Sequence, residues 1–176
     1  MSELRTPLNI AVIGAGRMGR IYAGIVSQMT PTRLVAVCGH GAERARSLAA
    51  SFDIPAYVDG RHDQMLEAHP EIDAVITTGG TGVTGRDVTP EAFQAVFDKE
   101  VPGFGELFRW ISFAKIKTSA IQSRAIAGVA GGTYLFAIPG SPGACKDAWD
   151  EILVYQLDSR SRPCNFVELM PRLNEQ

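Results

Sequence analysis

A short strand that runs through a glycine-rich turn into a helix is the feature that most limits how this chain can fold. Leu8–Ile13 is an apolar run that Gly14 ends, and apolar residues then recur at helical spacing over 21–29. After a helix break at Thr30-Pro31, a second run of β-branched and apolar residues follows at 33–38. Two parallel strands joined by a helix require a sheet covered by helices, so this opening predicts an α/β fold.

The same alternation continues along the chain. A pair of short apolar runs on either side of Gly131-Gly132 predicts a hairpin. Helices are expected over 42–52, 64–68, from 90 onward, 104–114 and 144–157, and strands over 54–58, 72–78, 124–130 and 133–138.

Right-handed crossovers and short connections restrict how these strands are arranged. With the strands numbered along the chain, the rules favour the order 3-2-1-4-6-5, with 124–130 antiparallel at one edge. We therefore expect a single domain over 1–176 with three layers, α/β/α, doubly wound around a mostly parallel sheet.

Glycine-rich loops follow the first, fourth and sixth strands. They are residues 14–19, 79–82 and 139–143. In an open α/β sheet, ligands bind beyond the carboxyl ends of the strands, beside the point where the winding reverses. We expect these three loops to form one binding region there.

Composition argues against several classes of partner. Hydrophobic residues make up 45%, charged residues 20%, and the net charge of -2 lacks the basic excess of a nucleic-acid-binding protein. No apolar run reaches the length of about 18 residues typical of a membrane span, and residues 1–7 lack a signal-peptide pattern, so we expect a cytoplasmic protein. Cys38, Cys145 and Cys164 lack the spacing of a zinc site, so reduced thiols and no bound metal are expected.

The first glycine loop has the pattern G-x-G-x-x-G in the strand–turn–helix context that makes it informative. Gly14 permits the tight turn, Gly16 lets the backbone approach a pyrophosphate, and Gly19 allows the helix to pack closely on the strand. Backbone N–H groups at the start of the helix, around Arg17 and Met18, favour an anion. The alternative is a glycine turn needed only for packing.

The acidic residue that usually holds the ribose of a dinucleotide is missing. Its position, at the end of the second strand, is occupied by Cys38-Gly39-His40. The sequence therefore does not support selectivity for NAD, and the nearby candidates for contact with a 2′-phosphate are His40 and Arg44.

Four segments of the first part of the chain occur together in one known family. They are IAVIGAGRMGR, LVAVC, AERARSLAASFDIPAYVD and HPEIDAVI. In them the chain resembles the NAD(P)-binding half of the glucose-fructose oxidoreductase and inositol dehydrogenase family. The resemblance implies a Rossmann-like βαβ fragment over 1–76 and NAD(P) as a cofactor. The family's Glu-Lys-Pro segment and substrate domain are absent, and Lys99 is expected on a helix surface instead.

The remaining residues, 77–176, resemble a second family. The segments TTGGTGVTGRDVTPEA, GFGELFR, TSAIQSRAIAG, LFAIPGSPGACKDAWDEI and QLDSRSRPCNF are similar to those of the molybdopterin-binding proteins of molybdenum cofactor biosynthesis, in particular the B proteins. The resemblance implies trimers or pairs of trimers. It also implies that Asp87, a candidate catalytic residue, and Glu106 shape a site whose other cofactor-binding residues are Gly79, Gly80, Thr81, Gly82, Pro139, Gly140 and Ser141.

The chemistry of these residues suits an anionic ligand. Backbone N–H groups of glycine loops form an anion nest, and the hydroxyls of Thr81 and Ser141 add neutral donors. The alternatives are ordinary turns and, for Asp87, a helix N-terminal charge near Thr89 and Pro90.

Each resemblance is incomplete, because each part of the chain lacks the site residues that the remaining part of a family member would contribute. We therefore favour an engineered chimera without efficient catalysis that binds a nucleotide or phosphate weakly. The alternatives are a molybdenum cofactor biosynthesis protein that binds molybdopterin or transfers adenylyl groups, and an NAD(P)-binding module. A homo-oligomer is expected, and the aromatic stretch Phe104, Phe108, Trp110 and Phe113 is either core or contact surface.

Overall fold

The computed structural model describes residues 7–29 and 32–175 and divides into two compact units, Met1–Ile76 and Thr77–Gln176. The expected helix break at Thr30-Pro31 and nearly all of the segment 1–7 lie outside the described residues. The boundary between the units coincides with the change of resemblance seen in the sequence. That the units together form a single domain stays a prediction.

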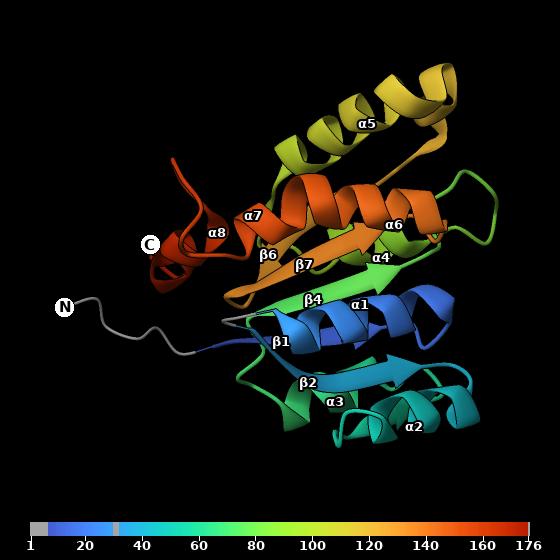
Figure 1. Cartoon of the computed structure of the whole chain (residues 1–176), viewed down its shortest axis with the longest axis vertical. Helices are drawn as coiled ribbons and strands as arrows, with labels where there is room; N and C mark the ends of the chain where they lie inside the picture. Colours follow the sequence, from blue (N-terminus) through green and yellow to red (C-terminus); the bar gives the residue numbers. More distant parts are fainter. Residues whose placement is uncertain (1–6, 30–31, 176) are drawn as a thin grey trace. The chain divides into compact units, whose positions relative to one another are not determined.

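The first unit alternates strands and helices as the sequence predicts (Figure 1). Its strands lie in the order β3-β2-β1-β4, and β1 pairs with β2, and β2 with β3, in parallel. The elements are β1 (Leu8–Ile13), α1 (Arg17–Gln28), β2 (Thr32–Gly39), α2 (Ala42–Ala50), β3 (Ala56–Val58), α3 (His62–Ala68) and β4 (Ala74–Thr78), the last of which ends in the second unit.

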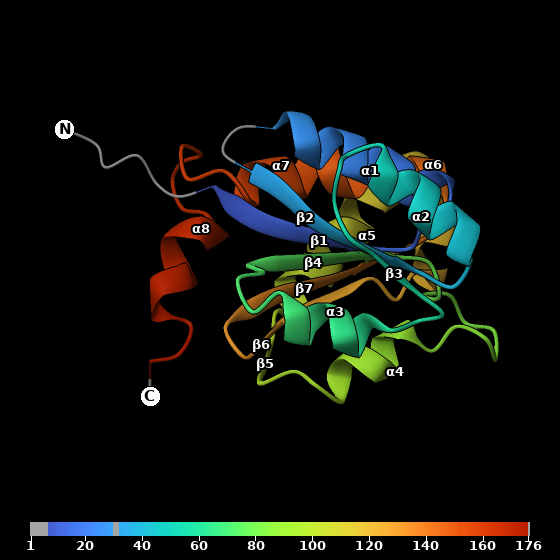
Figure 2. The ribbon, with the colours of Figure 1, turned by 90° about the horizontal axis from the view of Figure 1, so that it is seen from below.

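Helices cover both faces of the first unit's strands. In Figure 2, α1 and α2 lie on one side of β1 and β2, and α3 lies on the other. The interior side chains include Ile10, Val12, Tyr22, Val37, Leu48 and Met65, each at most 1% exposed. This unit therefore has the expected three-layer α/β/α arrangement.

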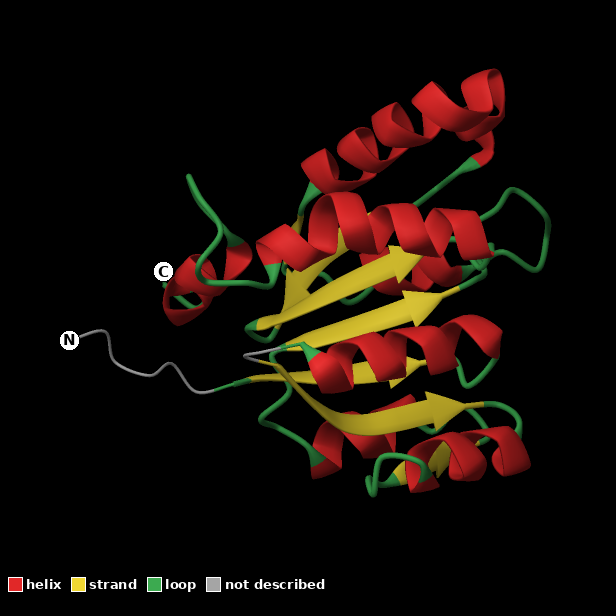
Figure 3. Ribbon diagram, viewed as in Figure 1, coloured by secondary structure: helices red, strands yellow, loops and turns green. Residues whose placement is uncertain are grey.

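The second unit continues the strand order as β4-β7-β6-β5. Gly131 and Gly132, both with positive φ, turn the chain between the antiparallel strands β6 and β7, so the predicted hairpin is confirmed. Helices and strands are coloured separately in Figure 3. The elements are α4 (Thr89–Gln94), β5 (Lys99–Glu100), α5 (Pro102–Ile116), the 3-10 helix η1 (Lys117–Gln122), β6 (Ile126–Ala130), β7 (Thr133–Ile138), α6 (Pro142–Ala148), the π-helical turn η2 (Trp149–Leu153), α7 (Val154–Gln156), α8 (Phe166–Leu169) and the 3-10 helix η3 (Met170–Arg172).

Two sequence expectations are wrong at the end of this sheet. Lys99 is not on a helix, because it lies in the two-residue strand β5, which pairs antiparallel with β6. Backbone N–H groups of Asp98 and Val101 donate to Val129 and Ala127 on either side of this pairing, each at 2.8 Å. The strand predicted over 124–130 is therefore antiparallel as expected, but β5 and not β6 forms the edge. A strand of two residues is too short to show any periodicity in the sequence.

Aromatic packing forms the interior of the second unit. The rings of Tyr134 and Phe136 on β7 contact Phe166, and Phe136 also contacts Phe104, with ring centroids 4.7–6.0 Å apart. In Figure 2, α4 lies on one side of this unit's strands and α6 and α7 lie on the other. The α/β class is thus confirmed in this unit too. Among the described residues, no helix is long and apolar enough to cross a membrane.

The closest packing in the first unit is between the glycine turn and α1. Gly14 has φ 117° and donates its N–H to the carbonyl oxygen of Cys38 at 2.8 Å. A Cβ added at Gly19 would lie 1.5 Å from the carbonyl oxygen of Gly14, whereas one added at Gly24 would meet nothing within 4 Å. Gly19 is therefore required by backbone contact, and Gly24 is not.

We predict that Gly19→Ala lowers the free energy of unfolding by about 3 kcal/mol, the upper end of the usual range for overpacking, because rigid backbone cannot yield to the added methyl group. Gly24→Ala, in the same helix, should instead raise it by about 0.5–1 kcal/mol, because alanine favours helix. Urea unfolding of the two variants measures both values. Equal stabilities would contradict the packing described here.

Candidate functional site

The glycine loop of the first unit presents backbone at the start of α1. Gly16 is the N-cap of α1 with no side-chain hydrogen bond, and a Cβ placed on it would meet nothing within 4 Å. The space above Gly16 is therefore open, as the approach of a phosphate requires. Arg17 is exposed, but the side chain of Met18 is buried at 7% exposure, so only the backbone of Met18 is available to a ligand.

Packing explains why no carboxylate stands at the end of β2. A Cβ at Gly39 would lie 2.8 Å from the Cβ of Ala15, so the glycine loop leaves no room for a side chain there. Burial raises the pKa of the neighbouring Cys38 thiol, and the charge of Asp63 adds to this effect. Cys38 is therefore a protonated core residue at neutral pH.

The loop that follows β4 closes on itself at its base. The N–H of Thr89 donates to the carbonyl of Gly80 and its Oγ1 donates to the carbonyl of Gly79, both at 3.0 Å. Gly79 and Gly80 have φ values of 99° and 69°, which favour glycine. The N–H of Gly79 is already used, because it donates to the carbonyl oxygen of Ile138 at 2.8 Å. We call residues 79–89 the GGTG loop.

The tip of the GGTG loop is held by Asp87. Its Oδ2 accepts hydrogen bonds from the N–H of Thr84 at 2.9 Å and from the Thr84 hydroxyl at 2.6 Å. These bonds, with a smaller contribution from the N–H of Gly82, lower the pKa of the Asp87 carboxyl below its usual value. Asp87 is therefore ionised at neutral pH. Both bonds from Thr84 fall on Oδ2.

A cavity of about 350 Å³ lies beside this tip, which we call the loop cavity. It brings together five predicted site residues from two loops: Thr81, Gly82, Asp87, Pro139 and Ser141. Its remaining lining residues are Val83, Thr84, Phe108, Ser112, Ile116, Gln122, Ser123 and Ala144.

The neighbouring third loop is also held closely against the GGTG loop. A Cβ on Gly140 would lie 3.2 Å from the Cα of Gly79, so these two backbones touch. The hydroxyl of Ser141 accepts the N–H of Ala144 at 3.3 Å and caps α6. Gly79, Gly80 and Gly140 therefore shape the backbone behind the loop cavity without lining it.

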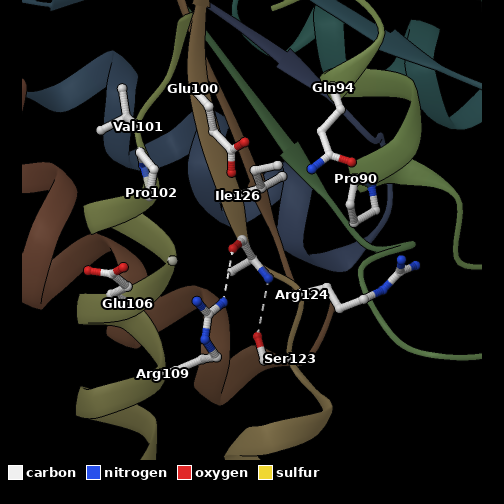
Figure 4. A pocket seen from close by; sticks show the side chains of 12 residues that line it. Pro90, Gln94, Glu100, Val101, Pro102, Glu106, Arg109, Ser123, Arg124 and Ile126 are labelled. Carbon is white, nitrogen blue, oxygen red and sulfur yellow. Dashed lines mark hydrogen bonds between the residues drawn. The ribbon is translucent and has the colours of Figure 1, made fainter.

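Glu106 is not part of the loop cavity. It lines a second cavity of about 260 Å³ between α4, β5, α5 and β6, together with Gln94, Glu100 and Arg109. Figure 4 shows Glu106 on α5 with its carboxylate turned away from the middle of this cavity. Successive helical residues are about 100° apart, so Glu106 and Phe108 lie on opposite sides of α5.

Two residues of the site were not expected from the sequence. Ser112 is 5% exposed and lines the loop cavity between Phe108 and Ile116, one helical turn from each. The spacing of four residues and the apolar neighbours could have indicated its position. Arg124 donates from Nε to the carbonyl oxygen of Gly82 at 2.6 Å, over a separation of 42 residues that no local pattern reveals.

Comparison with known families gives two matches that overlap over residues 56–98. Residues 56–159 match the family described as a probable molybdopterin binding domain, and residues 8–98 match the oxidoreductase family with an NAD-binding Rossmann fold. Each match spans more than half of the chain. The chain therefore belongs to the molybdopterin binding domain family, with a first part that belongs to the oxidoreductase family.

Individual relatives come from molybdenum cofactor biosynthesis. The chain is 56% identical over 99 residues to molybdenum cofactor biosynthesis protein B of Escherichia coli (strain K12), which covers 56% of this chain and 58% of that protein. A crystal structure of molybdenum cofactor biosynthesis protein B is 30% identical with a TM-score of 0.59, covering 89% of this chain and 94% of that one. The molybdopterin biosynthesis Mog protein of Mycobacterium ulcerans is 28% identical with a TM-score of 0.60, covering 88% and 98%.

The sequence match thus spans little more than half of the curated relative, whereas the structural matches extend over most of both chains. Both resemblances noted in the sequence are confirmed.

We predict that Gly80→Ala destabilises the second unit by about 1–3 kcal/mol, because its φ of 69° is strained for alanine and the new Cβ would lie 2.3 Å from Oγ1 of Thr89. Gly85→Ala is the control in the same loop, since a Cβ there meets nothing within 4 Å. Thermal unfolding of both variants tests the difference. A loop that tolerates both changes equally would not have the closure described.

Proposed function

We propose that the second unit binds a molybdopterin-type ligand, a pterin that carries a phosphate, in the loop cavity. The observation that carries the proposal is the ionised Asp87 in the lining of a mainly apolar cavity whose polar groups are mostly hydroxyls. Membership of the probable molybdopterin binding domain family and similarity to molybdenum cofactor biosynthesis protein B support it.

The walls of the loop cavity suit a flat ring with a polar edge. Phe108, Ile116 and Pro139 supply apolar surface, and the hydroxyls of Ser112 and Ser141 supply donors and acceptors. The amino and ring N–H groups of a pterin are donors, which a carboxylate accepts. Asp87 is therefore assigned to the ring's donor edge.

The phosphate is assigned to backbone groups. None of the lining residues, all of which the structure describes, is Lys or Arg. A phosphate near this cavity therefore depends on the N–H groups of the GGTG loop, which can form an anion nest.

Ligand binding by the second unit does not decide whether the chain is an engineered chimera without efficient catalysis. Two families in one chain support a fusion, and the match to only 58% of the Escherichia coli relative means that the activity of that protein is not carried over as a whole. A turnover assay with nucleotide and molybdopterin decides whether adenylyl transfer occurs.

A second candidate function is nucleotide binding by the first unit. The open space above Gly16 favours it, and the blocked position at Gly39 argues against strong NAD selectivity. Titration with NAD, NADP, AMP and inorganic phosphate, followed by the amide shifts of Gly14–Gly19, tests this candidate.

Asp87→Asn should weaken binding of pterin-6-carboxylate, measured by its fluorescence, by at least about tenfold, because an amide removes the charge that receives the ring's donors. Glu106→Gln is the matched control, because Glu106 lines the other cavity, and it should change affinity less than about twofold. Equal losses in the two variants would contradict the assignment to the loop cavity.

The same site gives a pH dependence. Because hydrogen bonds from Thr84 lower the pKa of Asp87, the carboxylate stays ionised as the pH falls from 8 to 5. Binding that needs this charge should therefore persist over that range and weaken only as the pH falls through the lowered pKa. Loss of binding already between pH 7 and 6 would assign recognition to another group.

We also propose a homo-oligomer, built as a trimer or pair of trimers as the family resemblance implies. Of the four aromatic residues in question, Phe104 and Phe108 are core residues, at 3% and 1% exposure. Trp110 and Phe113 are 73% and 51% exposed, and with Ile121, 83% exposed, they line an apolar hollow over α5 and η1.

Light scattering should therefore give a mass above that of one chain, and Trp110→Glu should shift it toward the monomer by placing a charge in a buried contact. Tyr155→Glu on α7, where the side chain is 56% exposed, is the control and should leave the mass unchanged. A wild-type mass of one chain at all concentrations would exclude the oligomer.

A further inference from the structure

A single guanidinium group spans the outside of the GGTG loop. Arg124 donates from Nε to the carbonyl of Gly82 at 2.6 Å, from one terminal nitrogen to the carbonyl of Asp87, and from the other to the carboxylate of Glu91. Its backbone N–H also donates to the carbonyl of Thr81 at 3.0 Å. One residue thus holds three positions of the loop.

Hydrogen bonds within the GGTG loop close its base and its tip, and Arg124 bonds to the part between them. Thr89 closes the base by bonding to the carbonyls of Gly79 and Gly80, and Thr84 and Asp87 close the tip. The carbonyls of Gly82 and Asp87, between base and tip, both bond to Arg124. Their separation is therefore set by the width of a rigid, planar group.

We propose that Arg124 is a positioning residue that holds Asp87 and the Thr81–Gly82 backbone at the spacing the ligand requires. The inference rests on the proposed function, since it concerns the same cavity. Arg124 itself does not line the loop cavity, so it acts through the loop and not on the ligand.

The geometry specifies arginine and not merely a positive charge. A lysine ammonium is a point charge on a flexible stem and cannot meet two carbonyls and a carboxylate in a fixed fork. Arg124 reaches the loop from the segment before β6, and it is also among the residues that line the second cavity (Figure 4). The loop is therefore fastened to the sheet through Arg124.

The competing explanation is that Arg124 only pairs with Glu91 at the surface. The Glu91 side chain is 57% exposed, and exposed ion pairs contribute little to stability. Glu91→Gln separates the two explanations, because it removes the charge of the ion pair and leaves both carbonyl bonds in place.

The experiment compares Arg124→Gln, Arg124→Lys and Glu91→Gln, with Arg109→Gln as the matched control. Arg109 is a neighbouring arginine whose recorded hydrogen bond, to the carbonyl of Ala125, is long at 3.5 Å. The first measurement needs no ligand: amide hydrogen exchange of residues 80–88, set against that of β6 and β7. The second is the affinity for pterin-6-carboxylate.

For Arg124→Gln we expect exchange over 80–88 to rise at least about tenfold while β6 and β7 keep their protection, and pterin affinity to fall at least about tenfold. Arg124→Lys should lie between this variant and wild type. Glu91→Gln and Arg109→Gln should each change both measurements less than about twofold. If Arg124→Gln does not fold, Arg124→Lys takes its place.

Unchanged exchange of the loop, a uniform rise across the whole second unit, or an equal effect of Glu91→Gln would each overturn the inference. Failure of wild-type protein to bind pterin-6-carboxylate would count against the proposed function alone, because the exchange of the unliganded loop still decides whether Arg124 positions it.

Discussion

Close contacts at glycines, where an added Cβ would crowd a neighbouring atom, are the constraint on which both candidate sites depend. In the first unit, Gly19 lies against the carbonyl of Gly14, and Gly39 lies against Ala15. In the second unit, Gly140 lies against Gly79, and Gly80 lies against Thr89. These contacts hold the glycine loops close to the helices and loops beside them. The same crowding removes the ribose-binding carboxylate from the end of β2.

The charged residues of the second unit differ in their position and in the groups that they bond to. Asp87 is held by Thr84 and stays ionised, whereas Glu106, only 19 residues later in the sequence, lies in a separate cavity. Arg124 is committed to loop carbonyls and is not available as a phosphate ligand. The chemistry of the loop cavity therefore comes from one carboxylate, several hydroxyls and the backbone.

The matches to the two families overlap in this chain. Both matches include residues 56–98, and the boundary between the compact units lies inside β4. The sequence of β4, AVITT, is rich in β-branched residues, and its first four residues are buried. Such a segment suits a buried parallel strand whatever sequence surrounds it.

The sequence alone predicted most of the helices and strands, their order apart from β5, and the glycine loops, because these depend on local spacing and on chain connection rules. It predicted Asp87, Thr81 and Ser141 as residues of one site, and all three line the loop cavity. Only the tertiary structure decided that β5 pairs with β6 and that Trp110 is exposed while Phe108 is buried. It also decided that Ser112 lines the loop cavity and that Arg124 bonds to the GGTG loop. The physical reason is that periodicity assigns a side chain to one face of an element, whereas the neighbour that covers that face comes from a distant part of the chain.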